Sequence, residues 1–227
     1  MWCRFCNYET SKKICPRCKN ETSEEIPTEI YWCVNCKVPV IKNANQADKD
    51  ECPLCRGKLS YLSQDLRPVF PEERLLLELL LDKTPHEFTQ KPVWCENSRY
   101  YVDGEAVALS SDDFKNADTD RLSQLLEAEK SRNSYDYFDA TIEKFIKSNR
   151  THLDELISES HAFIQKTASR FPTENIVLSF SGGKDSTVTA DVVTKALSNP
   201  SLVHIFGNTT LEFPSTYDYV KRFRADH

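Results

Sequence analysis

The run from Ile176 to Thr187 constrains the fold of this chain more than any other segment. It reads Ile-Val-Leu-Ser-Phe-Ser-Gly-Gly-Lys-Asp-Ser-Thr, an apolar stretch followed by a small, hydroxyl-rich and basic turn that opens a helical pattern. Paired glycines let the backbone turn with its N–H groups facing inward, and the first turn of a helix has N–H groups without intrahelical acceptors. Together these features predict an anion-binding nest suited to the phosphates of a nucleotide.

The side chains of the turn also suit a polyphosphate. They offer three hydroxyl donors, a mobile ammonium group and a carboxylate that can help to hold Mg2+ across phosphate oxygens. An ordinary strand-turn-helix with a polar turn is the alternative interpretation. The expected nucleotide contacts are Ser181, Gly182, Gly183, Lys184, Asp185, Ser186 and Thr187, with Lys184 and Asp185 as the expected catalytic residues.

The turn is not a Walker A loop, which requires G-x-x-x-x-G-K followed by Ser or Thr. Here Asp185 follows Lys184, and no glycine stands five residues before Gly183. The segment Ser181 to Ser186 instead resembles the PP-loop, S-G-G-x-D-S, of the ATP pyrophosphatase superfamily. This resemblance implies an enzyme that splits ATP between its α- and β-phosphates and adenylates a substrate.

The residues after the turn predict a β-α-β unit. A helical pattern covers Ser186 to Ser198, and Leu202 to Phe206 is a second apolar strand. We expect parallel strands, a right-handed crossover and one crevice at the carboxyl ends of both strands, as in a Rossmann-like α/β domain. Asn208, Thr209 and Thr210 are then candidates for contacts with nucleotide or substrate, although a turn that caps the next helix explains them equally well.

The segment from Phe206 to Val220 makes the resemblance more specific. It looks like the D-T-G-x-x-F-P-E-T segment of the phosphoadenosine phosphosulfate (PAPS) reductase family, which includes PAPS reductases, ATP sulfurylase small subunits and a DNA-phosphorothioation pyrophosphatase. Asn208 replaces the usual Asp and Thr210 the usual Gly. Within this family, true PAPS reductases have a degenerate loop that lacks the full S-G-G-x-D-S, whereas members that cleave ATP keep it. The complete loop here therefore implies ATP binding with Mg2+ and α–β cleavage more than sulfonate reduction. The matching positions are Thr209, Phe213, Pro214 and Thr216.

Eight of the nine cysteines form four C-x-x-C pairs near the N-terminus. Two such pairs complete the four-sulfur shell that Zn2+ favours in structural sites, and an iron–sulfur cluster is the alternative. The segment resembles tandem zinc ribbons that need metal to fold, and a structural cap is slightly favoured over docking to nucleic acid or protein. We assign one zinc to Cys3, Cys6, Cys15 and Cys18, and a second zinc to Cys33, Cys36, Cys52 and Cys55.

The middle of the chain carries weaker signals. The pattern predicts a helix over Pro71 to Leu81, a hairpin over Val93 to Leu109 around Asp103-Gly104, and helices over 112–130 and 135–170, the second interrupted near 148–151. Cys95 stands alone beside Trp94 on a predicted strand. We expect it to be a small core residue rather than a nucleophile.

Composition indicates a soluble protein with an N-terminal metal-binding part, and the β-α-β pattern with the PP-loop resemblance implies the α/β fold class. The net charge is −6, no apolar run is long enough for a membrane helix, and paired cysteines favour the reducing cytoplasm. Only 52 residues follow from Ile176 to the end, so we expect the nucleotide-binding domain to be truncated. The predicted domains are tandem zinc ribbons over 1–60, a helix and β-hairpin region over 68–133, and the N-terminal part of a PP-loop domain over 134–227.

The sequence therefore predicts a PP-loop protein of the PAPS reductase family that cleaves ATP to activate or transfer a sulfur-related group. A PAPS reductase that takes PAPS in place of ATP is one alternative. A tRNA thiolase is another, because those enzymes also join cysteine pairs to a PP-loop, but Leu211 to Pro214 argues against it. The third alternative is a zinc-ribbon docking protein whose nucleotide site is not catalytic.

Overall fold

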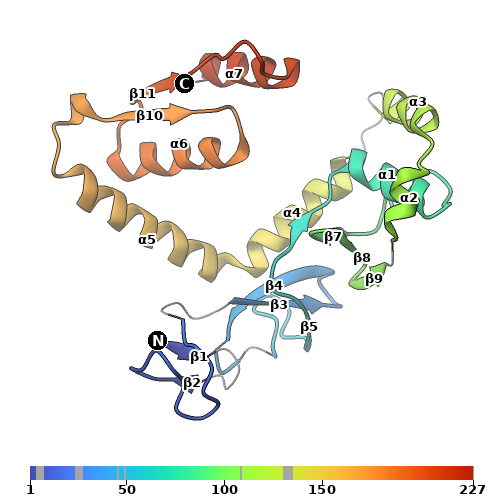
Figure 1. Cartoon of the computed structure of the whole chain (residues 1–227), viewed down its shortest axis with the longest axis horizontal. Coiled ribbons are helices and arrows are strands. Elements are labelled where there is room, and N and C mark those ends of the chain that lie inside the picture. Colours follow the sequence, from blue (N-terminus) through green and yellow to red (C-terminus); the bar gives the residue numbers. More distant parts are fainter. Residues whose placement is uncertain are drawn as a thin grey trace. The chain divides into compact units, whose positions relative to one another are not determined.

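The computed structural model describes residues 1–3, 8–23, 28–44, 46–48, 50–107, 109–129 and 135–226. The chain is a mixed α/β protein that divides into two compact units, unit 1 (Met1–Arg150) and unit 2 (Thr151–His227) (Figure 1). None of the helices in the described ranges is long and apolar enough to cross a membrane.

Unit 1 begins with two small antiparallel sheets. β1 (Trp2–Cys3) pairs with β2 (Tyr8–Glu9), and β3 (Thr28–Cys33), β4 (Val38–Asn43) and β5 (Leu59–Ser63) form a sheet in the order β4-β3-β5. The second sheet has an apolar core that includes two cysteines of the predicted metal set. Since so few apolar side chains are buried here, a metal ion is expected to supply much of the folding free energy. The core residues are Tyr31, Cys33, Val40, Cys52 and Leu59.

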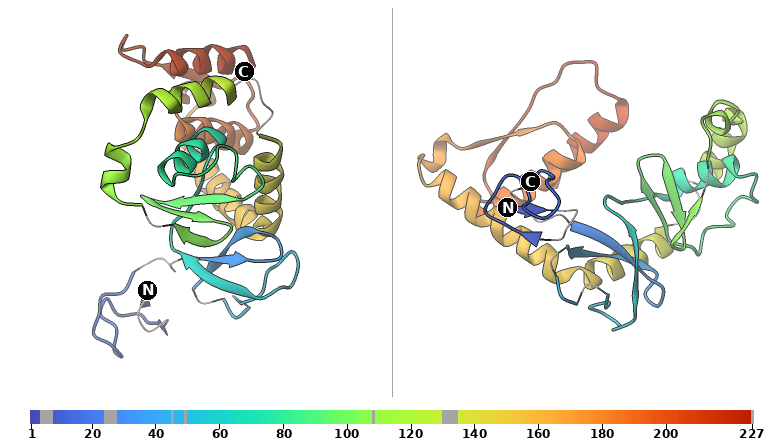
Figure 2. Two further views of the ribbon diagram at one scale, coloured as in Figure 1. Left: turned by 90° about the vertical axis from the view of Figure 1, so that its right-hand side faces the viewer. Right: turned by 60° about the horizontal axis from the view of Figure 1, so that its bottom comes forward.

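The next part of unit 1 consists of a four-stranded sheet and a short helix. β6 (Arg67–Pro68), β7 (Val93–Glu96), β8 (Arg99–Val102) and β9 (Glu105–Val107) form an antiparallel sheet in that order, and α1 (Pro71–Leu80) starts with Pro at its first position (Figure 2). The predicted turn at Asp103-Gly104 is confirmed, but it joins β8 to β9. A further turn, at Asn97-Ser98, joins β7 to β8 and was missed. The buried cluster beneath this sheet contains Val69, Leu77, Phe88, Val93, Cys95 and Tyr100.

The helix predicted over 112–130 is two helices. α2 (Ser111–Lys115) has a capping box formed by Ser110 and Asp113, and α3 (Thr119–Glu129) begins where Asp118 Oδ1 accepts a hydrogen bond from the N–H of Arg121, 2.8 Å away. The prediction of one continuous helix was wrong because Asp118 caps a new helix start. The predicted end, Lys130, lies outside the described residues.

The interruption predicted near 148–151 is confirmed. α4 (Tyr135–Ser148) and α5 (Arg150–Ala168) are separated by Asn149, which is 3% exposed. Its side-chain oxygen accepts from the N–H of Ile41 at 2.6 Å, and its amide donates to the carbonyls of Pro39 at 3.0 Å and Phe145 at 2.8 Å. Asn149 therefore fixes the end of α4 to strand β4 within unit 1.

Unit 2 contains the predicted β-α-β unit. After α5 and a short 3-10 turn (Thr173–Asn175), β10 (Val177–Phe180) leads to α6 (Lys184–Leu197), and β11 (Val203–Phe206) leads to α7 (Pro214–Asp226). β10 and β11 pair in parallel, as predicted, whereas the other sheets described are antiparallel. Helix α6 begins two residues earlier than the sequence indicated. The core of this unit is Phe180, Ala190 and Phe223, and Phe180 stacks on Phe223 with ring centroids 4.1 Å apart.

Candidate nucleotide and metal sites

The predicted nucleotide loop lies between β10 and α6. Phe180, buried in the core, ends the strand, and Gly182 has a positive φ of 76°. Gly183 occupies the N-cap position of α6 with extended backbone angles and makes no side-chain capping bond. The N–H groups of the first turn of α6 are thus not capped by the N-cap side chain, which is the arrangement that attracts an anion.

Gly182 also lies close to α7. A Cβ atom at this position would lie 2.9 Å from Cγ2 of Val220 and 3.1 Å from Cγ2 of Thr216. Any side chain would therefore collide with α7 as well as strain the backbone. Gly183 is different, because its φ is negative and a Cβ would lie 3.5 Å from Ser181 Oγ.

The three hydroxyl groups of the loop are all engaged in local hydrogen bonds. Ser181 Oγ donates to Ser186 Oγ at 3.1 Å. Ser186 Oγ and Thr187 Oγ1 donate to the carbonyl of Gly183 at 2.9 and 3.0 Å. Thr187 Oγ1 also lies 2.9 Å from the hydroxyl of Tyr219 in α7. The loop is therefore organised by its own side chains and by α7.

Lys184 and Asp185 extend from the loop into solvent. Their side chains are 89% and 93% exposed, and Lys184 Nζ lies 4.0 Å from Asp185 Oδ1. At this separation and exposure the mutual attraction is weak, so both groups are free to turn toward a ligand. An ammonium group suits phosphate oxygens, and a carboxylate oxygen suits Mg2+.

Asn208 and Thr209 follow β11 at the same sheet edge. The parallel register pairs Phe180 with Phe206, so the residues after both strands leave the sheet side by side. Asn208 Oδ1 accepts from the N–H of Thr210 at 2.8 Å and from the hydroxyl of Tyr217 at 2.7 Å. Its oxygen is thus engaged in the turn before α7, which is the capping alternative that the sequence left open.

Thr210 shows why the resembling motif has glycine at its position. The φ angle of Thr210 is 66°, in the left-handed region that a β-branched residue rarely adopts. Thr209 Oγ1 donates to Glu212 Oε1 at 2.9 Å and accepts from the N–H of Leu211 at 3.4 Å. These bonds hold the turn in a strained conformation next to the predicted site.

Four residues contact the loop or its neighbouring turn; the sequence pointed to Thr216 only as a motif match, and the other three were missed. They lie on α7, where the pairs 216–219 and 217–220 are three residues apart and the pair 216–220 four, so the set covers one side of the helix. That spacing was a usable signal for a helix face turned toward the loop, but it does not show which loop atoms the face contacts. The residues are Thr216, Tyr217, Tyr219 and Val220.

The second predicted zinc set forms a compact sulfur cluster. The Sγ atoms of all four cysteines lie within 4.8 Å of one another, with Cys33 and Cys55 3.4 Å apart and Cys36 and Cys52 3.9 Å apart. Zn–S bonds of about 2.3 Å in a tetrahedron place sulfurs about 3.8 Å apart, so the cluster fits Zn2+. The N–H groups of Cys36 and Gly57 also donate to cluster sulfurs, at 3.4 Å each.

The first set is described in part. The Sγ atoms of Cys3, Cys15 and Cys18 lie within 4.8 Å of one another, and those of Cys3 and Cys18 are 3.4 Å apart. The fourth predicted ligand, Cys6, lies outside the described residues. Both clusters can bind a metal ion.

The thiols of the second cluster differ in acidity. Burial raises the pKa of Cys33 to about 11 and also raises the pKa of Cys36. Burial acts in the same direction on Cys55, but the N–H of Gly57 and the neighbouring thiols outweigh it and lower the pKa of Cys55 to about 7. Cys55 therefore loses its proton more readily than Cys33 or Cys36, whose protons a bound metal must displace.

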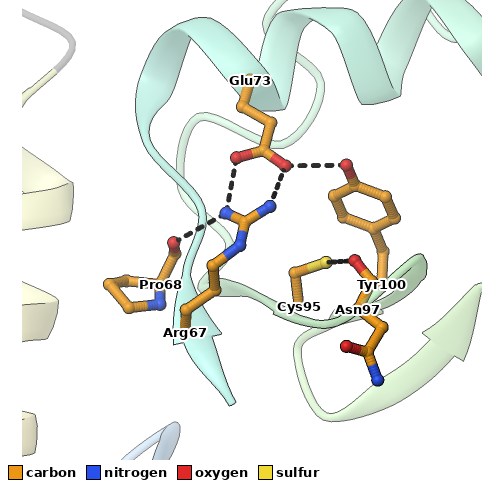
Figure 3. Close-up of polar contacts among 6 residues, drawn as sticks. All are labelled: Arg67, Pro68, Glu73, Cys95, Asn97 and Tyr100. Carbon is orange, nitrogen blue, oxygen red and sulfur yellow. Dashed lines mark hydrogen bonds and ion pairs between the residues drawn. The ribbon is translucent and has the colours of Figure 1, made fainter.

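Cys95 is a core residue, as the sequence predicted. It is 1% exposed, its Sγ donates to the carbonyl of Asn97 at 3.1 Å, and burial raises its pKa. Beside it, Arg67 forms two hydrogen bonds of 2.6 and 2.7 Å with Glu73, which also accepts from the hydroxyl of Tyr100 at 2.7 Å (Figure 3). A buried thiol with a raised pKa is a poor nucleophile.

Comparison with known proteins supports the C-terminal part of this interpretation. Residues 175–226 match the family model of the phosphoadenosine phosphosulfate reductase domain. The match covers the loop, both parallel strands and α7.

Two relatives come from Methanocaldococcus jannaschii. The uncharacterized protein MJ0973 is 36% identical over 84 residues, which are 36% of this chain and 20% of that protein. The uncharacterized protein MJ0066 is 30% identical over 132 residues, which are 56% of this chain and 27% of that protein. The chain thus spans about a quarter or less of the length of these relatives. No solved structure matches.

Proposed function

We propose that this protein is a PP-loop enzyme of the PAPS reductase family that binds ATP with Mg2+ and cleaves it between the α- and β-phosphates. The cleavage would activate or transfer a sulfur-related group. One observation carries the proposal: a complete S-G-G-K-D-S loop joins β10 to α6 inside the segment that matches the family model.

Each residue of the loop has a part in this proposal. The first-turn amides of α6, with Gly182 and Gly183 permitting the close approach, would bind the phosphates. Lys184 would neutralise charge that develops on the departing pyrophosphate, and Asp185 would hold Mg2+, which supplies further charge stabilisation when bound. An acceptor would attack the α-phosphorus, so the protein needs no covalent nucleophile and acts by positioning. The remaining proposed contacts are Ser181, Ser186, Thr187, Asn208 and Thr209.

The N-terminal cysteines complete the proposal. Zn2+ at both clusters would hold residues 1–60 as tandem ribbons, followed by the region 68–133 and by the nucleotide-binding domain from residue 134. Thiolate ligands need a reducing compartment such as the cytoplasm. A role of the ribbons in docking nucleic acid or protein would come in addition to this structural one.

The test is nucleotide binding by the zinc-loaded chain, measured by calorimetry with ATP and Mg2+. We expect Lys184→Ala to weaken binding by roughly 10- to 100-fold, since it removes a charged phosphate contact. Lys195→Ala is the matched control, because Lys195 lies on the same helix in an exposed ion pair with Asp191. Absence of ATP binding to the unaltered chain would refute the proposal.

The family whose model matches residues 175–226 favours a second candidate, reduction of PAPS. A parallel assay of pyrophosphate and sulfite release separates the two. Pyrophosphate release from ATP, tested with sulfate, tRNA or DNA as the added acceptor, supports the first function. Sulfite release from PAPS without cleavage of ATP supports reduction, and nucleotide binding without either product supports a docking protein.

A further inference from the structure

We propose that Tyr219 is a positioning residue for the nucleotide loop. Through Thr187 it holds the carbonyl of Gly183 in the orientation that aims the amide of Lys184 at the phosphates. This inference rests on the proposed function and gives Thr187 a different part from the direct phosphate contact that the sequence predicted.

The direction of the hydrogen bonds follows from a count of protons. Thr187 Oγ1 donates to the carbonyl of Gly183 at 3.0 Å. A hydroxyl has a single proton, so in the 2.9 Å bond between Thr187 and Tyr219 the proton must come from Tyr219. The relay therefore runs from the Tyr219 hydroxyl to Thr187 Oγ1, and from Thr187 to the Gly183 carbonyl.

The carbonyl at the end of this relay accepts three hydrogen bonds. Gly183 O accepts from the N–H of Thr187 at 3.1 Å, from Thr187 Oγ1 and from Ser186 Oγ. In a planar trans peptide the carbonyl of one residue and the N–H of the next point in opposite directions. With the Gly183 carbonyl fixed along α6, the N–H of Lys184 points out of the helix start, toward the place where an anion would bind.

The ring of Tyr219 is held in place independently of its hydroxyl. Its centroid lies 6.4 Å from that of Phe180 and 6.4 Å from that of Phe223, and the guanidinium carbon of Arg222 lies 5.9 Å from it. A phenylalanine would keep these contacts, since only the hydroxyl is lost. Tyr219→Phe therefore removes the first step of the relay without removing the packing of α7.

The substitution is tested by binding of inorganic pyrophosphate and of ATP with Mg2+ to the zinc-loaded chain. We expect Tyr219→Phe to raise the Kd of both ligands roughly five-fold, the usual effect of losing one hydrogen bond, in a chain that remains folded. Thr187→Val should weaken binding by a similar factor. Because both residues belong to one relay, the double variant should bind no more weakly than the weaker single variant.

Thr189→Val is the matched control. Thr189 Oγ1 donates to the carbonyl of Asp185 at 2.8 Å, so this variant removes the same kind of bond further along α6. It should leave the Kd unchanged. Additive losses in the double variant, or binding by Tyr219→Phe at the unaltered Kd, would overturn the inference.

A second readout needs no ligand. The amide resonance of Lys184 in the 15N–1H spectrum should move in Tyr219→Phe and in Thr187→Val, and stay in place in Thr189→Val. An unmoved Lys184 resonance in the first two variants would show that no relay exists. Failure of the unaltered chain to bind either ligand instead refutes the proposed function, so the two failures are distinguishable.

Discussion

At the scale of single residues, Gly182 and Gly183 are neighbours in one motif, but only Gly182 is required to be glycine. We expect Gly182→Ala to destabilise unit 2 by about 2 to 4 kcal/mol, because it combines a positive φ with a collision against Val220. Gly183→Ala should cost about 1 kcal/mol or less, since its backbone angles suit any residue. Thermal unfolding of both variants, each compared with the unaltered chain, measures the difference. Equal losses would contradict this account.

The same scale shows what sequence can and cannot predict about a site. Cys33 and Cys36 were predictable as ligands because a C-x-x-C turn brings its two sulfurs together by local geometry alone. The bond between Thr187 and Tyr219 joins residues 32 positions apart and depends on how α7 packs. Spacing along the chain does not predict such a contact, so Tyr219 was missed.

At the scale of elements, one carboxylate joins three of them. Glu73 of α1 binds Arg67 of β6 and Tyr100 of β8, and the bond from Arg67 holds its pKa below the ordinary value of 4.5 although burial opposes this. A lowered pKa in the folded state stabilises the protein above the unfolded pKa, and that stability is lost as the pH falls through the folded value. The network should thus weaken below about pH 4.5.

The expected result is a pH-dependent effect of Glu73→Gln. The variant should be less stable than the unaltered chain by about 1 to 3 kcal/mol at pH 7, and the difference should shrink as the pH falls below 4.5. Urea unfolding at several pH values measures it. Glu143→Gln is the control, because its ion pair with Lys147 is exposed and screened by solvent. A difference that stays constant with pH would argue against the network.

Elements were predicted best where a local signal was strong. The apolar runs gave β10, β11 and α1 to within a residue or two, because burial needs that pattern. The prediction of one helix over 112–130 was wrong at Asp118, because its side chain caps the start of a new helix and this local bond outweighs helical periodicity. The turn at Asn97-Ser98 was not predicted because neither residue is a glycine, although Asn97 adopts a φ of 54°.

At the scale of the whole molecule, the two units should respond differently to loss of metal. Trp32, next to the predicted ligand Cys33, is buried, and its indole lies so close to Gly104 that any side chain at position 104 would collide with it. Chelation should therefore expose Trp32 and shift its fluorescence to longer wavelength, while the α-helical circular dichroism of unit 2 persists. Cooperative loss of both signals would contradict this expectation.

Metal content gives an independent check. The chain should bind two zinc ions, and Cys55→Ser should reduce this to one, because it removes a ligand of the second cluster. Cys95→Ser is the control, since Cys95 belongs to neither set, and it should leave two. Zinc released by a thiol-reactive reagent can be titrated with a coloured indicator. Visible absorption from iron and sulfide would instead favour the iron–sulfur alternative.

The three hydrogen bonds of Asn149 have a consequence for dissecting this protein. They are all made within unit 1, one residue before its end. The terminus of α4 is thus secured by strand β4 of the same unit. A fragment cut after Arg150 should therefore fold by itself. In the same fragment with Asn149→Ala, the end of α4 should fray, and a carboxypeptidase should digest it faster.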